Sequence, residues 1–284
     1  MIQKILLADS GTGHSVEMLQ SLMDLPAIQG ASVTALHVVS QQLSKDAMEE
    51  KSQEGEKLLE KTVQTLKLDP SKISKLLRQG DPKSVVCKTA EEINADLIIM
   101  GSRGLKRLVS ILENSVSQYV FQLTDRPMLL VKDDIYVKKI KRVMVALDKS
   151  GAAQVSLDLA CFLLRGYSDA ELILTRINPD LDPKLLPLSK EDTENNPVMA
   201  ESIPKVKNQG IKYRCVVTAG RPGQQICNLA EEYNADLLIL GSPDRRPSVA
   251  KVLPDLDRLL GTSLSDYVRV NANCPVLLAR KEFA

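Results

Sequence analysis

Short apolar runs alternate with amphipathic stretches along the first half of the chain. The runs are almost wholly apolar, as is typical of parallel strands buried on both faces. They fall at residues 5–8, 33–39, 73–77, 97–100 and 128–131. Between them, apolar residues recur at helical spacing, as in Val16, Leu19 and Leu22. This strict alternation predicts an α/β fold with a doubly wound, open parallel sheet, in which ligands bind at the carboxyl ends of the strands.

The second half of the chain repeats the first. GDPKSVVCKTAEEINADLIIMGS begins at Gly80 and GRPGQQICNLAEEYNADLLILGS begins at Gly220, an offset of 140 residues that holds without a gap. Other equivalent pairs follow in the same order: Asp9 with Asp148, Tyr119 with Tyr267, and Pro127 with Pro275. We therefore expect two tandem copies of one domain, at residues 1–134 and 139–284.

Composition excludes several classes of function. The 37 basic and 36 acidic residues give a net charge of +1, so no long-range field attracts nucleic acid or an anionic membrane. Aromatic residues make up 3% of the chain, which predicts an aliphatic core and disfavours a surface that stacks bases. The five cysteines are far apart and form no C-x-x-C pair, which disfavours a disulfide framework or a zinc site. We expect a cytoplasmic protein without nucleic-acid partners or membrane insertion.

One loop of the first half has the features of a phosphate site. The apolar run at 97–100 leads into Gly101-Ser102-Arg103-Gly104, and a helical pattern begins near Ser115. Such a loop offers unobstructed backbone N–H groups and the positive end of a helix dipole. Arg103 and the hydroxyls of Ser115 and Ser117 would add contacts to phosphate oxygens. The alternative is that the glycines only turn the chain and the basic residues are solvated.

The spacing of this loop resembles the nucleotide signature G-x2-G-x9-G-[S/T] of the universal stress protein family. Here Gly101, Gly104 and Asn114-Ser115 take those positions, and ILLADS, ALHVV, IIMGSRG, NSVSQYV and RPMLLVK follow in the order of the family. The resemblance covers essentially the whole chain twice. It implies two domains of the adenine nucleotide α-hydrolase-like fold that pair through their last strands within one chain. A homodimer of such chains is a further possibility that the family suggests.

The resemblance also implies a ligand, namely ATP or another adenine nucleotide, alone or with Mg²⁺, in the first domain. The residues expected around it are Ala8, Asp9, Ser10, Val38, Met100, Gly101, Arg103, Gly104, Asn114, Ser115, Val116 and Ser117. Asn114 replaces the second signature glycine and adds a side chain where a phosphate must approach closely. We expect this replacement to weaken binding without abolishing it.

The second half departs further from the signature. Asp244 takes the position of Gly104. The offset between equivalent residues grows from 140 at Gly241 to 148 at Tyr267, so eight extra residues fall in this loop. Arg176 replaces His37, and Ile177 replaces Val38. A carboxylate close to phosphate is unfavourable. We therefore expect one nucleotide site, in the first domain, and a second domain that is structural or regulatory.

Three functions remain open at this point. The first is a stress-response or signalling protein whose bound nucleotide changes the surface offered to a protein partner that the sequence does not identify. The second is a scaffold of the same family that has lost nucleotide binding. The third is a slow ATPase, for which Glu113 is the one evident general base near the loop. An enzyme is the less favoured class, and we expect His37 and the cysteines to have structural roles.

The composition of one segment in the second half predicts its structure. Residues 178–204 are rich in proline and acidic side chains. This composition predicts a surface loop.

Overall fold

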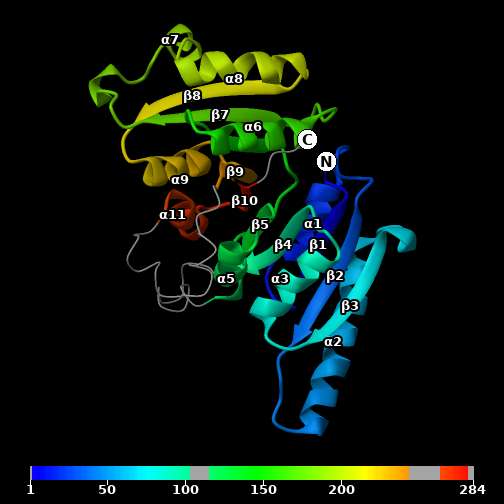
Figure 1. Ribbon diagram of the computed structural model, residues 1–284. Helices are drawn as coiled ribbons and strands as arrows, with labels where there is room; N and C mark the ends of the chain where they lie inside the picture. The colour runs from blue at the N-terminus through cyan, green and yellow to red at the C-terminus, as the bar shows by residue number, and fades with distance from the viewer. Residues whose placement is uncertain (1, 103–114, 243–262, 281–284) are drawn as a thin grey trace. The chain divides into compact units, whose positions relative to one another are not determined.

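The computed structural model describes residues 2–102, 115–242 and 263–280 of the chain. The chain divides into two compact units: residues 1–24 with 28–137, and residues 138–284 with 25–27. Each unit contains a five-stranded parallel sheet flanked by helices (Figure 1). None of the helices within the described ranges is long and apolar enough to cross a membrane.

The first unit has the strand order β3-β2-β1-β4-β5, with every pair parallel. Its strands are β1 (Lys4–Ala8), β2 (Ser32–Val39), β3 (Ile73–Gln79), β4 (Leu97–Ser102) and β5 (Met128–Lys132). Its helices are α1 (Ser15–Met23), α2 (Lys45–Leu66), α3 (Pro82–Glu92) and α5 (Val116–Leu123), with a short 3-10 turn at Pro70–Lys72. The alternation that the sequence predicts is confirmed.

The second unit has the equivalent order, β8-β7-β6-β9-β10, again with every pair parallel. Its strands are β6 (Arg142–Ala146), β7 (Glu171–Asn178), β8 (Lys212–Ala219), β9 (Leu237–Gly241) and β10 (Val276–Ala279). Its helices are α6 (Gly151–Leu164), α7 (Lys190–Glu194), α8 (Pro197–Asn208), α9 (Pro222–Glu232) and α11 (Leu264–Asn271), with a 3-10 turn at Pro183–Leu185.

The order of the strands determines which face each helix covers. From β1 the chain moves outward to β2 and β3, and then crosses back to β4 on the other side of β1. Right-handed crossovers in opposite directions place their helices on opposite faces. Consistent with this, α1 packs against α2, and α3 packs against α5.

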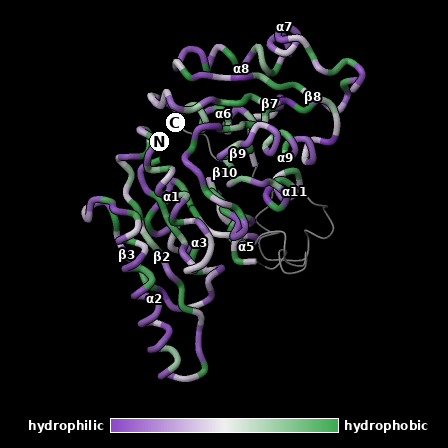
Figure 2. Tube along the Cα trace, turned by 180° about the vertical axis from the view of Figure 1, so that it is seen from behind, coloured by the Kyte–Doolittle hydropathy of each residue, from purple (hydrophilic) through white to green (hydrophobic). Residues whose placement is uncertain are grey.

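Burial follows the position of a strand in its sheet. Ile5, Leu6 and Leu7 in the central strand β1 are fully buried, as expected of a strand covered on both faces. The same expectation is wrong for β3, whose residues are exposed or half-buried because it forms an edge of the first sheet. The helix beside it, α2, is largely hydrophilic in Figure 2, and it buries only a narrow stripe that includes Leu59 and Leu66.

The prediction of a surface loop at 178–204 is wrong for its second half. Helix α8 begins at Pro197, where a proline is favoured because the first turn of a helix needs no N–H donor. It continues past Pro204 and buries Met199, Ile203 and Val206. Apolar packing therefore offsets the hydrogen bond that Pro204 removes, and composition alone does not contain this information.

Gly241 at the end of β9 is required by close packing, unlike its equivalent Gly101. A Cβ atom at Gly241 would overlap the carbonyl group of Ala152 and lie 2.9 Å from the backbone nitrogen of Ala153, both in α6. A Cβ atom at Gly101 would meet nothing closer than 3.7 Å.

We predict that Gly241→Ala lowers the free energy of unfolding by about 2 kcal/mol or more, because backbone atoms would have to shift. The matched change Gly101→Ala should alter it by less than about 0.5 kcal/mol. Urea unfolding of the full chain, followed by circular dichroism, measures both. Equal midpoints for the two variants would show that α6 adjusts freely at this contact.

Candidate functional site

The reversal of strand order between β1 and β4 creates a crevice at the carboxyl ends of these strands, which is where open α/β sheets bind ligands. A cavity of about 470 Å³ occupies this position in the first unit. Its size lies within the ordinary range for small-molecule sites. Of the predicted site residues, those that line it are Ala8, Asp9, Ser10, Val38, Met100, Gly101, Ser115, Val116 and Ser117. Arg103, Gly104 and Asn114 lie outside the described residues.

Asp9 is held at one wall of the cavity by two hydrogen bonds. Its Oδ1 accepts from the backbone N–H of Gly11 at 2.8 Å, and its Oδ2 accepts from the hydroxyl of Thr62 in α2 at 2.6 Å. The carboxylate is therefore fixed in a buried position, yet each oxygen keeps a second lone pair for a ligand. Asp9 both caps the turn after β1 and presents an acceptor to the cavity.

His37 supports the same wall from the neighbouring strand β2. Its Nδ1 lies 2.8 Å from the carbonyl oxygen of Asp9. Because a carbonyl only accepts, Nδ1 carries the proton in this contact. The ring packs against Gly55 of α2, where an added Cβ atom would come within 2.8 Å of it. The expected structural role of His37 agrees with these contacts, although its side chain also lines the cavity.

Three serines line the cavity where β4 ends and α5 begins. Ser115 caps the N-terminus of α5, accepting from the N–H of Gln118 at 3.1 Å, and its oxygen lies 3.2 Å from that of Ser117. The buried hydroxyl oxygen of Ser102, at the end of β4, has no hydrogen-bond partner within the described part of the chain. All three serines line the cavity, so this end offers hydroxyl donors beside a helix N-terminus.

The charge of the described lining is negative. Asp9 and Asp133 are its charged side chains, and none of the described lining residues is a lysine or an arginine. Asp133 directly follows β5, and its backbone N–H donates to the carbonyl of Ser102 at 3.0 Å. The cavity therefore combines an acidic wall, aliphatic residues and a cluster of hydroxyls.

Thr62 and Asp133 are among the residues of this site that the sequence analysis did not single out. A signal exists for each. Thr62 lies on the apolar stripe of α2 between Leu59 and Leu66, where a buried hydroxyl needs a partner. Asp133 directly follows the fully buried strand β5, at the carboxyl ends of the strands, where ligands bind in such sheets.

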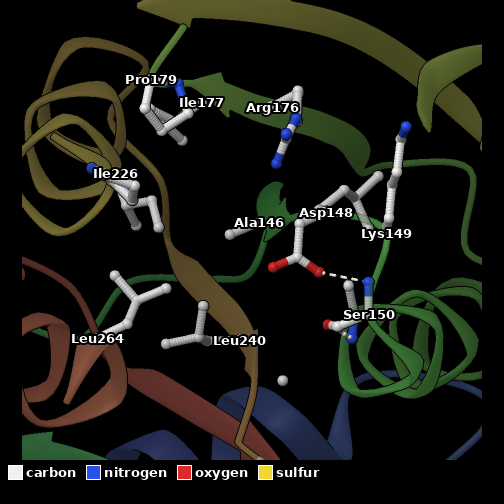
Figure 3. Close-up of a pocket in the computed structure, with 14 residues that line it drawn as sticks. Ala146, Asp148, Lys149, Ser150, Arg176, Ile177, Pro179, Ile226, Leu240 and Leu264 are labelled. Carbon is white, nitrogen blue, oxygen red and sulfur yellow. Dashed lines mark hydrogen bonds between the residues drawn. The ribbon is translucent and has the colours of Figure 1, made fainter. Parts of the chain in front are cut away.

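The second unit has a cavity at the equivalent place, with a volume of about 440 Å³ (Figure 3). Asp148, Arg176 and Ile177 line it at the positions of Asp9, His37 and Val38. Asp244, the carboxylate predicted at a signature position of this half, lies outside the described residues.

Three of the five cysteines show no sign of nucleophilic activation. Burial raises the pKa of the Cys87, Cys161 and Cys215 thiols to about 11 each. These thiols therefore stay protonated at neutral pH, which is the opposite of what a reactive cysteine requires. Within the described ranges, no group of three or more potential ligands is placed to hold a metal ion.

Both units are thus doubly wound α/β domains with a ligand-sized cavity at the reversal point of the sheet. The model of the universal stress protein family matches residues 1–132 and 139–280. The chain belongs to the universal stress protein family and carries its domain twice.

Comparison with individual proteins gives the following similarities. Universal stress protein YxiE of Bacillus subtilis (strain 168) is 27% identical over 148 residues, which are 46% of this chain and 100% of YxiE. A universal stress protein of Archaeoglobus fulgidus DSM 4304, known from its crystal structure, has the same fold, with a TM-score of 0.72 and 24% identity. That match covers 98% of this chain and 96% of the other. A family protein of Arabidopsis thaliana, solved with AMP bound, covers 51% of this chain and 93% of its own, with 20% identity and a TM-score of 0.35.

The contact between Thr62 and Asp9 leads to a test. We predict that Thr62→Val lowers the free energy of unfolding by about 1–3 kcal/mol, because a buried carboxylate oxygen loses its donor. Thr65→Val is the matched control on the same helix, since the Thr65 hydroxyl donates only to the carbonyl of Lys61 one turn earlier. Thermal and urea unfolding of the two variants measure the difference. If both substitutions have equal effects, the hydrogen bond to Asp9 does not stabilise this wall.

Proposed function

We propose that the first domain binds ATP or another adenine nucleotide in the cavity between β1 and β4, and that binding changes the surface offered to a partner protein in stress response or signalling. The observation that carries this proposal is the grouping of the Ser102, Ser115 and Ser117 hydroxyls in one cavity with Asp9.

The wall around Asp9 suits the nucleoside. The fixed carboxylate is a hydrogen-bond acceptor for a ribose hydroxyl, as in other nucleotide sites of doubly wound sheets. Val38, Met100 and Val116 supply apolar surface for a purine ring. Aliphatic contacts are what this chain has available, because its aromatic content is only 3%.

The serine cluster suits the phosphates. The N-terminus of α5 favours negative charge, and the hydroxyls of Ser115 and Ser117 stand at that terminus. The Ser102 hydroxyl, which lacks a partner within the described ranges, is a donor that a phosphate oxygen would satisfy.

Charge balance in the cavity requires a cation. Asp133 lies beside Ser102, and a carboxylate so close to a phosphate is unfavourable by itself. Arg103, which follows Ser102 in sequence, is one source of positive charge. Mg²⁺ carried in with the phosphates is another, since it binds through carboxylates and phosphate oxygens and keeps several waters.

Two other functions compete with this proposal. A scaffold that has lost its ligand would show no nucleotide-dependent stabilisation. A slow ATPase would need a general base at the phosphate end. There Asp133 is the described carboxylate, and Glu113 lies outside the described residues.

The experiment that tests the proposal is calorimetric titration of the full chain with MgATP, with the thermal unfolding midpoint as a second readout. We expect one nucleotide per chain and a midpoint that rises with ligand concentration, because the ligand binds the folded state alone. Absence of heat and of any shift with ATP, ADP or AMP would favour the scaffold.

Ser102→Ala sharpens this test. It should weaken ATP binding about tenfold or more, because hydrogen bonds to charged groups contribute about 1.5–3 kcal/mol. Stability without ligand should stay unchanged, since no bond to a described residue is lost. Ser242→Ala is the matched control in the second unit, where the hydroxyl donates to Ser265 at 3.4 Å. It should leave ATP binding unchanged, and equal loss of affinity in both variants would contradict a site in the first domain.

A further inference from the structure

The cavity of the second unit is similar in volume to the first but differs in most of its polar groups. Its walls are formed by the aliphatic side chains of Ile177, Ile226, Leu240 and Leu264. These occupy the positions of Val38, Val86, Met100 and Val116 in the first unit. The apolar surface is therefore retained, and the difference between the two cavities lies in their charges and hydroxyls.

Positive charge stands at the carboxyl ends of β6 and β7. Arg176 extends from β7 toward the part of the cavity where Asp148 lies (Figure 3), and Lys149 follows Asp148 in the adjacent turn. Neither cation has a hydrogen bond or an ion pair with any of the described residues. Asp148 accepts from the N–H of Ser150 at 2.8 Å. The described lining thus has two cations and one carboxylate, whereas the first cavity has two carboxylates.

The equivalent serines of the second unit contact one another and Asp266. The hydroxyl of Ser263 donates to Asp266 at 2.7 Å and lies 3.0 Å from that of Ser265, to which Ser242 also donates. Arg269 approaches the same Asp266 carboxylate at 3.4 Å. These three serines are equivalent to Ser102, Ser115 and Ser117, yet none of them lines the cavity. The helix end that would receive phosphates is therefore occupied by Asp266 and its partners.

We infer that the second cavity binds a small organic anion with a compact apolar body, whose negative head group contacts Arg176, with Lys149 adding positive charge from the adjacent turn. The apolar body lies among the four aliphatic side chains. A guanidinium without a partner in the described chain is a strong, directional donor pair for such a head group. The positive charge of this site lies at the carboxyl ends of β6 and β7. In a nucleotide site it would lie at the N-terminus of the last helix. The inference does not depend on nucleotide binding by the first domain.

Two fluorescent probes that differ by one charged group test this inference. The first, 1-anilinonaphthalene-8-sulfonate, is an apolar body with an anionic head. The second, N-phenyl-1-naphthylamine, lacks the sulfonate. We expect the wild-type chain to bind the sulfonate probe at one saturable site, and Arg176→Met to raise its dissociation constant about tenfold or more. Binding of the neutral probe should change less than about twofold in Arg176→Met, because the substitution removes no apolar surface.

Arg214→Met is the control for loss of a nearby positive charge. Arg214 is more than one-third exposed on β8, pairs with Glu171 at 3.3 Å and does not line the cavity, so probe binding should not change. Lys149→Met is a second test variant, at an exposed position, which serves if Arg176→Met does not fold. It should weaken binding of the sulfonate probe severalfold. Equal binding of the sulfonate probe by wild type, Arg176→Met and Lys149→Met would overturn the inference, as would its failure to bind the wild type.

Competition identifies the head group. Displacement of the Arg176-dependent probe by 1-naphthoate or by 1-naphthyl phosphate supports the inference, and the tighter competitor distinguishes a carboxylate from a phosphate. Displacement by neither would overturn it. Displacement of that same probe by ATP would reveal a second nucleotide site, and would overturn the assignment of a non-nucleotide anion.

Discussion

Right-handed crossover is the constraint on which the rest of each domain depends. Because the connections leave β1 in one direction and return to β4 on its other side, the helices must cover opposite faces of the sheet. The connection after β1 and the connection after β4 then lead away from each other, and a gap remains between the carboxyl ends of these two strands. The cavity, the turn capped by Asp9 and the serine cluster all lie at this opening. The second unit obeys the same constraint at β6 and β9.

The wall of the first cavity depends on contacts that join remote parts of the chain. Asp9 follows β1 and Thr62 belongs to α2, yet their side chains lie 2.6 Å apart in a buried position. His37 reaches the carbonyl of Asp9 only because Gly55 leaves room for its ring. Asp9 therefore links three elements: its carbonyl oxygen contacts His37 of β2, and its carboxylate accepts from Thr62 of α2. These contacts hold the buried carboxylate at the wall of the cavity.

Local pattern was enough to predict the alternation of strands and helices. The family resemblance supplied the expected site residues, nine of which line the cavity because parallel strands bring their carboxyl ends to one edge. Local pattern was not enough for β3, since an apolar run does not reveal whether a strand lies at the centre or the edge of a sheet. It also failed at α8, where buried Ile203 and Val206 keep a helix intact around Pro204. Thr62 escaped because its partner lies 53 residues away, and residue type alone does not specify such a pair.

Duplication within one chain separates the requirements of folding from those of ligand binding. The aliphatic positions of the two cavities differ only in side-chain size, because both must pack against the same elements. The polar positions are free of this requirement and have diverged: His37 corresponds to Arg176, Ser10 to Lys149, and Gln118 to Asp266. Each change alters charge without adding bulk to the core. If the second cavity were only a structural remnant, nothing in its packing would require an arginine that lines the cavity without an ion-pair partner among the described residues. A structural role therefore accounts for the aliphatic wall of the second cavity but not for its cationic end.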